Sequence, residues 1–137
     1  MSNITVRHVD GDRFAIETRD HVLTVDQPLA AGGDDTAPTP TELFVASLAS
    51  CVAFYARRYL ARHDLPTTGL RVIAAYDMAQ RPARVGSVSL DITLPEGVPG
   101  DQRDRLLAVA SHCTVHNSLI TPPQVMIAVA GAPVTAA

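Results

Sequence analysis

Apolar and polar residues alternate near the N-terminus over residues 4–9 and 13–18, with Asp10-Gly11-Asp12 between the two segments. Alternation with a period of two is typical of strands that bury one face, and the Asp and Gly residues between them favour a turn. We therefore predict a β-hairpin followed by a third short strand over 21–25, so that residues 3–26 form the first part of a sheet.

The clearest helix signal begins at Thr39-Pro40-Thr41-Glu42, which provides an N-cap hydroxyl, a Pro at the first helical position and a Glu that completes a capping box. The residues from 43 to 56 are apolar on nearly every side, and Arg57-Arg58 follows them. A helix that is apolar all round is usually buried all round. The pattern predicts a central core helix over about 40–63, enclosed on every side.

The second half of the chain contains three further patterns. Residues 69–94 form two β-rich runs, 101–113 carry apolar residues at helical spacing, and an apolar run within 123–130 predicts a last strand. No internal repeat is present. The order of these elements predicts a single α+β domain over residues 1–137.

The amino-acid composition limits the functions that the protein could have. The chain is 47% hydrophobic and 18% charged, which supports a real core, and its net charge of -3 provides no basic surface for a polyphosphate. We expect no nucleic-acid partner.

The N-terminus lacks the pattern of a signal peptide, and no uninterrupted apolar run approaches the roughly 20 residues that span a bilayer. We therefore expect a soluble, cytoplasmic protein with no membrane partner.

Cys51 and Cys113 are the two cysteines, too few for a secreted disulfide scaffold. Free Cys usually packs as a small hydrophobe, so inert buried thiols are one interpretation and redox chemistry is another. A metal site is a third, because Cys113 and His116 have the spacing of a half-site to which Cys51 could add a ligand. Structural zinc sites usually have two close ligand pairs, and Cys51 stands alone, so we predict no metal.

Residues 40–51 and 113–119 resemble the two cysteine motifs of the OsmC/Ohr family, the osmotically inducible and organic hydroperoxide resistance proteins. The similarity extends over nearly the whole chain and is closer to the OsmC-like branch than to a typical Ohr protein. The resemblance implies an antiparallel sheet that wraps a long central helix in an intertwined homodimer, with active sites at the subunit interface.

The family resemblance also implies thiol-dependent reduction of hydroperoxides. Cys51 would attack the peroxide as a thiolate and become a sulfenic acid, and Cys113 would condense with it to a disulfide. An external thiol or dithiol would restore the enzyme without a bound cofactor. Lowering the pKa of Cys51 needs a cation or hydrogen-bond donors, and the resemblance makes Arg19 the candidate; a solvated hairpin Arg is the alternative.

Two positions depart from the family pattern. Thr41 stands where hydroperoxide reductases have a Glu, ten residues before the cysteine, that holds the activating Arg. Glu42 is one residue out of register and, at about 100° per residue, faces away from Cys51, so we assign it to the capping box. Thr114 replaces a common Pro after the second cysteine and is expected to change the end of the helix.

Two principal hypotheses follow. The first is a peroxidase for bulky organic hydroperoxides, because large apolar side chains of the central helix would line its pocket: Leu43, Phe44, Leu48, Phe54 and Tyr55. The second is a non-catalytic binding module of the same fold, with a small hydrophobic or thiol-reactive ligand at the dimer interface. The loss of the family Glu favours the second. A structural protein with slow, inert thiols is a third alternative.

Overall fold

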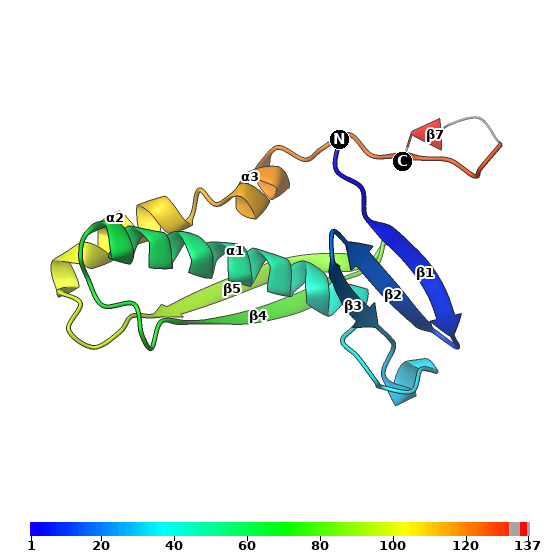
Figure 1. Cartoon of the computed structure of the whole chain (residues 1–137), viewed down its shortest axis with the longest axis horizontal. Helices are drawn as coiled ribbons and strands as arrows, with labels where there is room; N and C mark the ends of the chain where they lie inside the picture. The colour runs from blue at the N-terminus through cyan, green and yellow to red at the C-terminus, as the bar shows by residue number, and fades with distance from the viewer. Residues whose placement is uncertain (132–134, 137) are drawn as a thin grey trace. The chain divides into compact units, whose positions relative to one another are not determined.

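The computed structural model describes residues 1–131 and 135–136 and shows a mixed α+β fold with antiparallel strands and one long helix (Figure 1). The chain forms two compact units, one of residues 1–47 with 74–90 and one of residues 48–73 with 91–137. The division falls within the long helix and within one β-hairpin.

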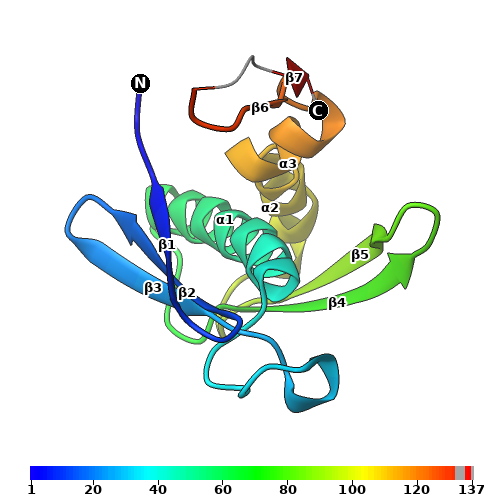
Figure 2. The same ribbon diagram turned by 90° about the vertical axis from the view of Figure 1, so that its right-hand side faces the viewer.

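The first unit begins with a three-stranded antiparallel sheet of β1 (Thr5–Asp10), β2 (Arg13–Thr18) and β3 (His21–Val25) (Figure 2). These strands lie where the alternating pattern predicts them. Val6 pairs with Ile16 and Ile16 with Leu23, so one face of the sheet is apolar. Side chains on opposite strands contact one another, and such pairs stabilise the sheet.

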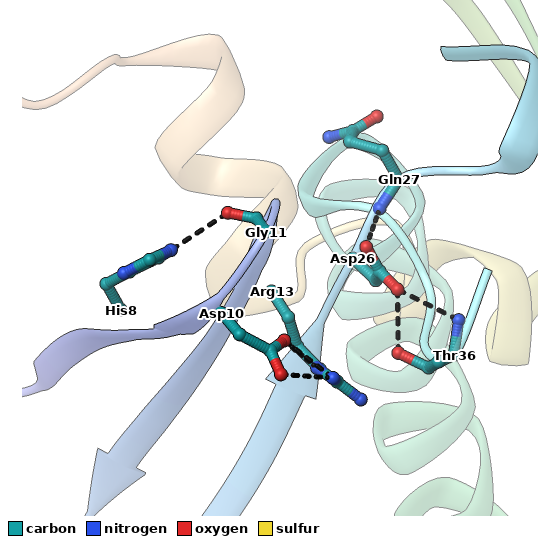
Figure 3. A network of polar contacts seen from close by, with 7 residues as sticks. All are labelled: His8, Asp10, Gly11, Arg13, Asp26, Gln27 and Thr36. Carbon is teal, nitrogen blue, oxygen red and sulfur yellow. Dashed lines mark hydrogen bonds and ion pairs between the residues drawn. The ribbon is translucent and has the colours of Figure 1, made fainter. Parts of the chain in front are cut away.

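The loop that follows β3 is organised around a buried carboxylate. Asp26 is 1% exposed and accepts hydrogen bonds from the Gln27 amide at 2.7 Å, the Thr36 amide at 3.0 Å and the Thr36 hydroxyl at 2.7 Å (Figure 3). The Thr36 hydroxyl and these amides lower the pKa of Asp26 to about 2. Gly33 also packs against this segment, since a Cβ there would lie 2.1 Å from the Gln27 carbonyl oxygen.

The predicted capping box is confirmed at the start of α1 (Pro40–Arg62). The Thr39 amide donates to Glu42 Oε1 at 3.0 Å, and the Glu42 amide donates to Thr39 Oγ1 at 3.1 Å. Two backbone donors that an uncapped helix leaves unpaired are thus satisfied reciprocally. Glu42 is engaged in this local contact.

The expectation that α1 is enclosed on every side is wrong for a single chain. Its buried residues recur at helical spacing along one stripe, while Phe44 is 42% exposed and Phe54 is 55% exposed. The chain's own elements cover one face of the helix. The buried apolar residues are Val45, Leu48, Val52, Ala56, Tyr59 and Leu60.

Among the helices of the described residues, α1 alone is long and apolar enough to cross a membrane by length and composition. This is weak evidence for a membrane span, since the core helix of a globular protein passes the same test. Arginines occupy its C-terminal turns, and Arg62 lies in the last one.

The strands predicted within 69–94 are β4 (Arg71–Ala79) and β5 (Arg84–Thr93), which form a two-stranded hairpin (Figure 2). In the second unit, a 3-10 turn, η2 (Gly100–Gln102), leads into α2 (Arg103–Ala110). The Tyr59 hydroxyl donates to Gln102 Oε1 at 2.7 Å and so joins α1 to this turn. Leu106 and Ala110 are the buried residues of α2.

The helix predicted over 101–113 ends earlier, at Ala110. The Ser111 hydroxyl and the His112 ring bond back to the carbonyl oxygens of Leu107 and Ala108, which terminates α2. Side chains that bond to nearby backbone carbonyls in this way compete with continued helix. A separate short helix, α3 (Thr114–Ile120), then begins, so Cys113 precedes a helix instead of ending one.

The strand predicted within 123–130 is also shorter than expected. Within the described residues it is reduced to β6 (Met126–Ile127), which pairs with β7 (Thr135–Ala136). A strand needs a neighbouring backbone to pair with along its whole length. The part of the chain after Gly131 thus includes a paired segment at 135–136, and residues 132–134 and 137 lie outside the description.

Candidate active site

Cys51 lies in the middle of α1 and within the second unit. Its side chain is half-buried and carries a free thiol. The next residue, Val52, belongs to the buried stripe of the helix, so the backbone at Cys51 is fixed by the core. A partly accessible thiol on a rigid element is the arrangement that a nucleophilic cysteine requires.

Cys113 is the N-cap residue of α3 and is fully buried. Its backbone is extended, with φ -67° and ψ 155°, and its Sγ accepts a hydrogen bond from the His116 amide at 3.4 Å. Burial raises the pKa of Cys113 above its ordinary value of 9.0; the His116 amide acts in the opposite direction, and the neighbouring Cys51 thiol raises it further. Cys113 is therefore a protonated thiol near neutral pH.

The structure brings the two cysteines together, although they come from distant parts of the sequence. The Cys51 thiol lies near enough to Cys113 to raise its pKa, and both are free thiols. The pair is thus a reduced dithiol in which one thiol is accessible and the other is buried.

A second contact joins the same two segments. The Tyr55 hydroxyl lies 3.0 Å from Thr114 Oγ1, within hydrogen-bond distance. The Tyr55 ring also packs edge-on against Phe54, with ring centroids 5.7 Å apart. The sequence reasoning assigned Tyr55 to an apolar pocket and missed this hydrogen bond. The available signal was the position of Tyr55 one helical turn after Cys51, on the same face.

The histidines beside Cys113 are engaged with backbone carbonyls. His116 Nδ1 bonds to the Ser111 carbonyl oxygen and His112 Nδ1 to that of Ala108, so Nδ1 carries the proton in both rings. Within residues 1–131 and 135–136, no three His, Cys, Asp or Glu side chains gather where they could hold a metal ion. The Cys113-x-x-His116 pair thus lacks a set of further ligands in that part of the chain.

Arg19 lies in the turn between β2 and β3, with an exposed side chain and a left-handed backbone at φ 52°. It belongs to the first unit, whereas both cysteines belong to the second. Its contact with Cys51 stays a prediction. Glu42 bonds to the Thr39 amide, as described above, which agrees with its assignment to the capping box.

The apolar side chains of α1 differ in their surroundings. Leu48 is buried, and Leu43 and Phe44 line two different cavities of the first unit. The cavity at Phe44 has a volume of about 380 Å³ and also includes Arg84. The cavity at Leu43 has a volume of about 430 Å³ and an entirely apolar set of neighbours: Val6, Phe14, Ile16, Val25 and Pro40.

Comparisons with known proteins agree with this fold. The comparison with curated protein sequences gives no match. Among solved structures, the chain is similar to a protein of Psychrobacter arcticus 273-4, provisionally described as an osmotic stress induced and detoxification response protein. The TM-score is 0.80 at 23% identity, over 86% of this chain and 88% of that one. At such identity the likeness concerns the fold.

Two further solved structures show the same fold. The OsmC-like protein of Mycoplasma pneumoniae has a TM-score of 0.75 at 14% identity, with 89% of each chain covered. The organic hydroperoxide resistance protein OhrB of Bacillus subtilis has a TM-score of 0.61 at 17% identity, over 86% of this chain and 89% of that one.

The family assignment comes from the sequence itself. A model of the family described as OsmC-like protein matches residues 32–128, a stretch that contains Cys51, Cys113 and the whole of α1. Since this match covers well over half of the chain, the protein belongs to the OsmC-like family.

Proposed function

We propose that the protein is a thiol-dependent peroxidase that reduces organic hydroperoxides through Cys51 and Cys113. The observation that carries the proposal is the pair of neighbouring free thiols, one partly accessible and one buried. Membership of the OsmC-like family supports it, as does the fold shared with an organic hydroperoxide resistance protein.

The first step takes place at Cys51. Its thiolate attacks the terminal oxygen of the hydroperoxide, the O–O bond breaks, and the departing alkoxide takes a proton and leaves as an alcohol. Cys51 keeps the transferred oxygen as a sulfenic acid. The half-buried position of Cys51 gives the peroxide access to the sulfur.

The second step uses Cys113. Its sulfur attacks the sulfur of the Cys51 sulfenic acid, the S–O bond breaks, and water leaves as the disulfide forms. Two equivalents of an external thiol, or one dithiol, then reduce this disulfide and are themselves oxidised. The proposed reductant pool is that of the cytoplasm, where thiols are kept reduced.

We also propose that the functional form is a homodimer. Large apolar side chains on the uncovered face of α1 and on the first sheet are exposed in the single chain, including Phe54, Phe44 and Val6. Large apolar side chains that are exposed on a helix or sheet face often mark an interaction site. A second copy that covers it would meet the sequence expectation of a helix enclosed on every side.

A binding module for a small hydrophobic ligand is the second candidate. The observation in its favour is the apolar cavity of about 430 Å³ between the first sheet and the start of α1, together with Thr41 in place of the family Glu. Its cysteines would sense or trap the ligand without turnover. Reaction with peroxide separates the two candidates.

The test is a thiol count on the reduced protein after one equivalent of an organic hydroperoxide, followed by peptide mapping. The peroxidase proposal expects both thiols to be lost together into a Cys51–Cys113 disulfide. Cys113→Ser should accumulate a Cys51 sulfenic acid that a dione probe captures, and Cys51→Ser should leave peroxide unconsumed. Two thiols that survive peroxide would overturn the proposal in favour of the binding module.

A further inference from the structure

We propose that the hydrogen bond between Tyr55 and Thr114 positions Cys113 against Cys51 and thereby favours the disulfide between them. Tyr55 follows Cys51 by one turn of α1, and Thr114 directly follows Cys113. The use of this disulfide in a peroxidase cycle rests on the proposed function, whereas the positioning of Cys113 by the hydrogen bond does not.

The two contacts lie side by side on the same pair of segments. Residues four apart on a helix share one face, so Cys51 and Tyr55 both point toward the segment that carries Cys113 and Thr114. The Cys51 thiol neighbours that of Cys113, and Tyr55 Oη lies 3.0 Å from Thr114 Oγ1. Two neighbouring contacts restrict both the distance and the rotation of one segment against the other, which one contact cannot do.

The segment around Cys113 is itself locally ordered. The Asn117 side-chain amide donates to the His112 carbonyl oxygen at 3.1 Å, and the Asn117 backbone amide donates to the Cys113 carbonyl oxygen at 2.9 Å. The His116 amide donates to Cys113 Sγ. Because these bonds hold the Cys113 backbone and the first turn of α3 as one piece, a constraint on Thr114 is transmitted to the adjacent sulfur.

The consequence for the redox equilibrium follows from linkage. A disulfide forms only within narrow limits of distance and dihedral angle, so freedom of the Cys113 segment in the reduced protein opposes bond formation. The Tyr55–Thr114 bond removes part of that freedom beforehand. Loss of the Tyr55–Thr114 hydrogen bond, if it has ordinary strength, should therefore lower the equilibrium constant for disulfide formation roughly 3- to 10-fold.

A purely structural role for the same bond makes a different prediction. Tyr55 would then contribute to the stability of the fold as Tyr59 does through its bond to Gln102, and the redox equilibrium would not change. Tyr59 is four residues further along α1 and two turns beyond Cys51. Tyr59→Phe is therefore a matched control that removes a hydroxyl hydrogen bond from the same helix without touching Thr114.

The experiment equilibrates the protein with mixtures of reduced and oxidised glutathione. In these mixtures the two protein thiols are oxidised to a disulfide while one glutathione disulfide is reduced to two glutathione thiols. Alkylation and mass spectrometry then measure the Cys51–Cys113 bond. Tyr55→Phe and Thr114→Val should each lower the equilibrium constant roughly 3- to 10-fold, with little further loss in the double variant. Thr114→Ser should retain the wild-type value, and so should Tyr59→Phe even if its melting temperature falls.

Equilibrium constants that match wild type in Tyr55→Phe and Thr114→Val would overturn the proposal. If one variant does not fold, the other decides, since each removes the same bond. The experiment contains no peroxide. A lower equilibrium constant for the disulfide in these variants than in the wild type therefore supports the inference even if peroxide does not react with the protein. A wild-type protein that forms no Cys51–Cys113 bond in any mixture would overturn both the inference and the proposed function.

Discussion

Cys113 is fully buried beside Cys51, whose own side chain is half-exposed. This asymmetry distinguishes two thiols that are chemically identical in the unfolded chain, because one is partly accessible to solvent and the other is not.

The first prediction concerns alkylation of the reduced native protein by iodoacetamide. Cys51 should react faster than Cys113 by at least roughly an order of magnitude, because a buried thiol waits for local opening of the structure. Peptide mass spectrometry over time measures both rates. In denaturant the two rates should converge, and equal rates in the native protein would contradict the burial of Cys113.

The second prediction concerns pH. Burial raises the pKa of Cys113, so its reactive thiolate is scarce at neutral pH and increases about tenfold per pH unit below the raised value. The decay of the Cys51 sulfenic acid into the disulfide should therefore accelerate with rising pH, up to and beyond the ordinary thiol value of 9.0. Rapid-quench mapping between pH 6 and 9 measures this rate; a pH-independent rate would refute the control by Cys113.

The raised pKa of Cys113 should also make the free energy of unfolding depend on pH in the alkaline range. A thiol whose pKa is raised by folding stabilises the native state fully below its unfolded pKa, and this contribution is lost as pH rises through the folded value. Cys113→Ser should remove that part of the alkaline fall in the free energy of unfolding. Chemical denaturation of both proteins across the alkaline range provides the comparison.

The third prediction concerns Asp26. Its pKa of about 2 lies below the ordinary value of 3.8, so its contribution to stability is present above the ordinary value and is lost as pH falls from about 4 toward 2. Asp26→Asn should lower the melting temperature by several degrees at pH 7, because an amide cannot accept all three donors. It should also flatten the acid dependence.

Asp35→Asn is the matched control for that variant, since Asp35 is exposed in the same loop and Asn tolerates its φ of 53°. It should unfold like the wild type between pH 2 and 7. A loss of stability as large as that of Asp26→Asn would show that the loop responds to its total charge and not to the buried carboxylate.

The fourth prediction separates helix capping from catalysis. Thr39→Ala and Glu42→Ala each remove one of the reciprocal bonds at the start of α1, so each should cost about 1 kcal/mol of stability. Urea unfolding measures the cost. Neither variant should change the Cys51–Cys113 equilibrium with glutathione, and a folded Glu42→Ala protein with an altered equilibrium would assign Glu42 a role at the thiols.

The fifth prediction concerns assembly. Sedimentation should give a mass of about twice the 14.5 kDa of one chain. Phe54 is 55% exposed on the uncovered face of α1, so Phe54→Glu should place a charge in the interface and weaken the dimer by at least roughly tenfold. A wild-type protein that sediments as a monomer would contradict the proposed homodimer.

Local patterns were enough to predict several elements. Alternation placed β1 and β2, and the capping box placed the start of α1 at Pro40, because these signals depend on neighbours in the sequence. The boundary between α2 and α3 was missed, since Ser111 and His112 end α2 through side-chain bonds to carbonyls that periodicity does not reveal. The length of β6 depended on whether a partner strand was available.

The sequence by itself determined the α+β class, the long central helix and the identity of the two cysteines, because periodicity, capping and composition act over a few residues. Tertiary structure decided that Cys51 and Cys113 are neighbours, that Cys113 is buried as the N-cap of α3, and that Tyr55 reaches Thr114. These relationships join residues about sixty positions apart in the sequence, and only the packing of α1 against the Cys113 segment brings such residues together.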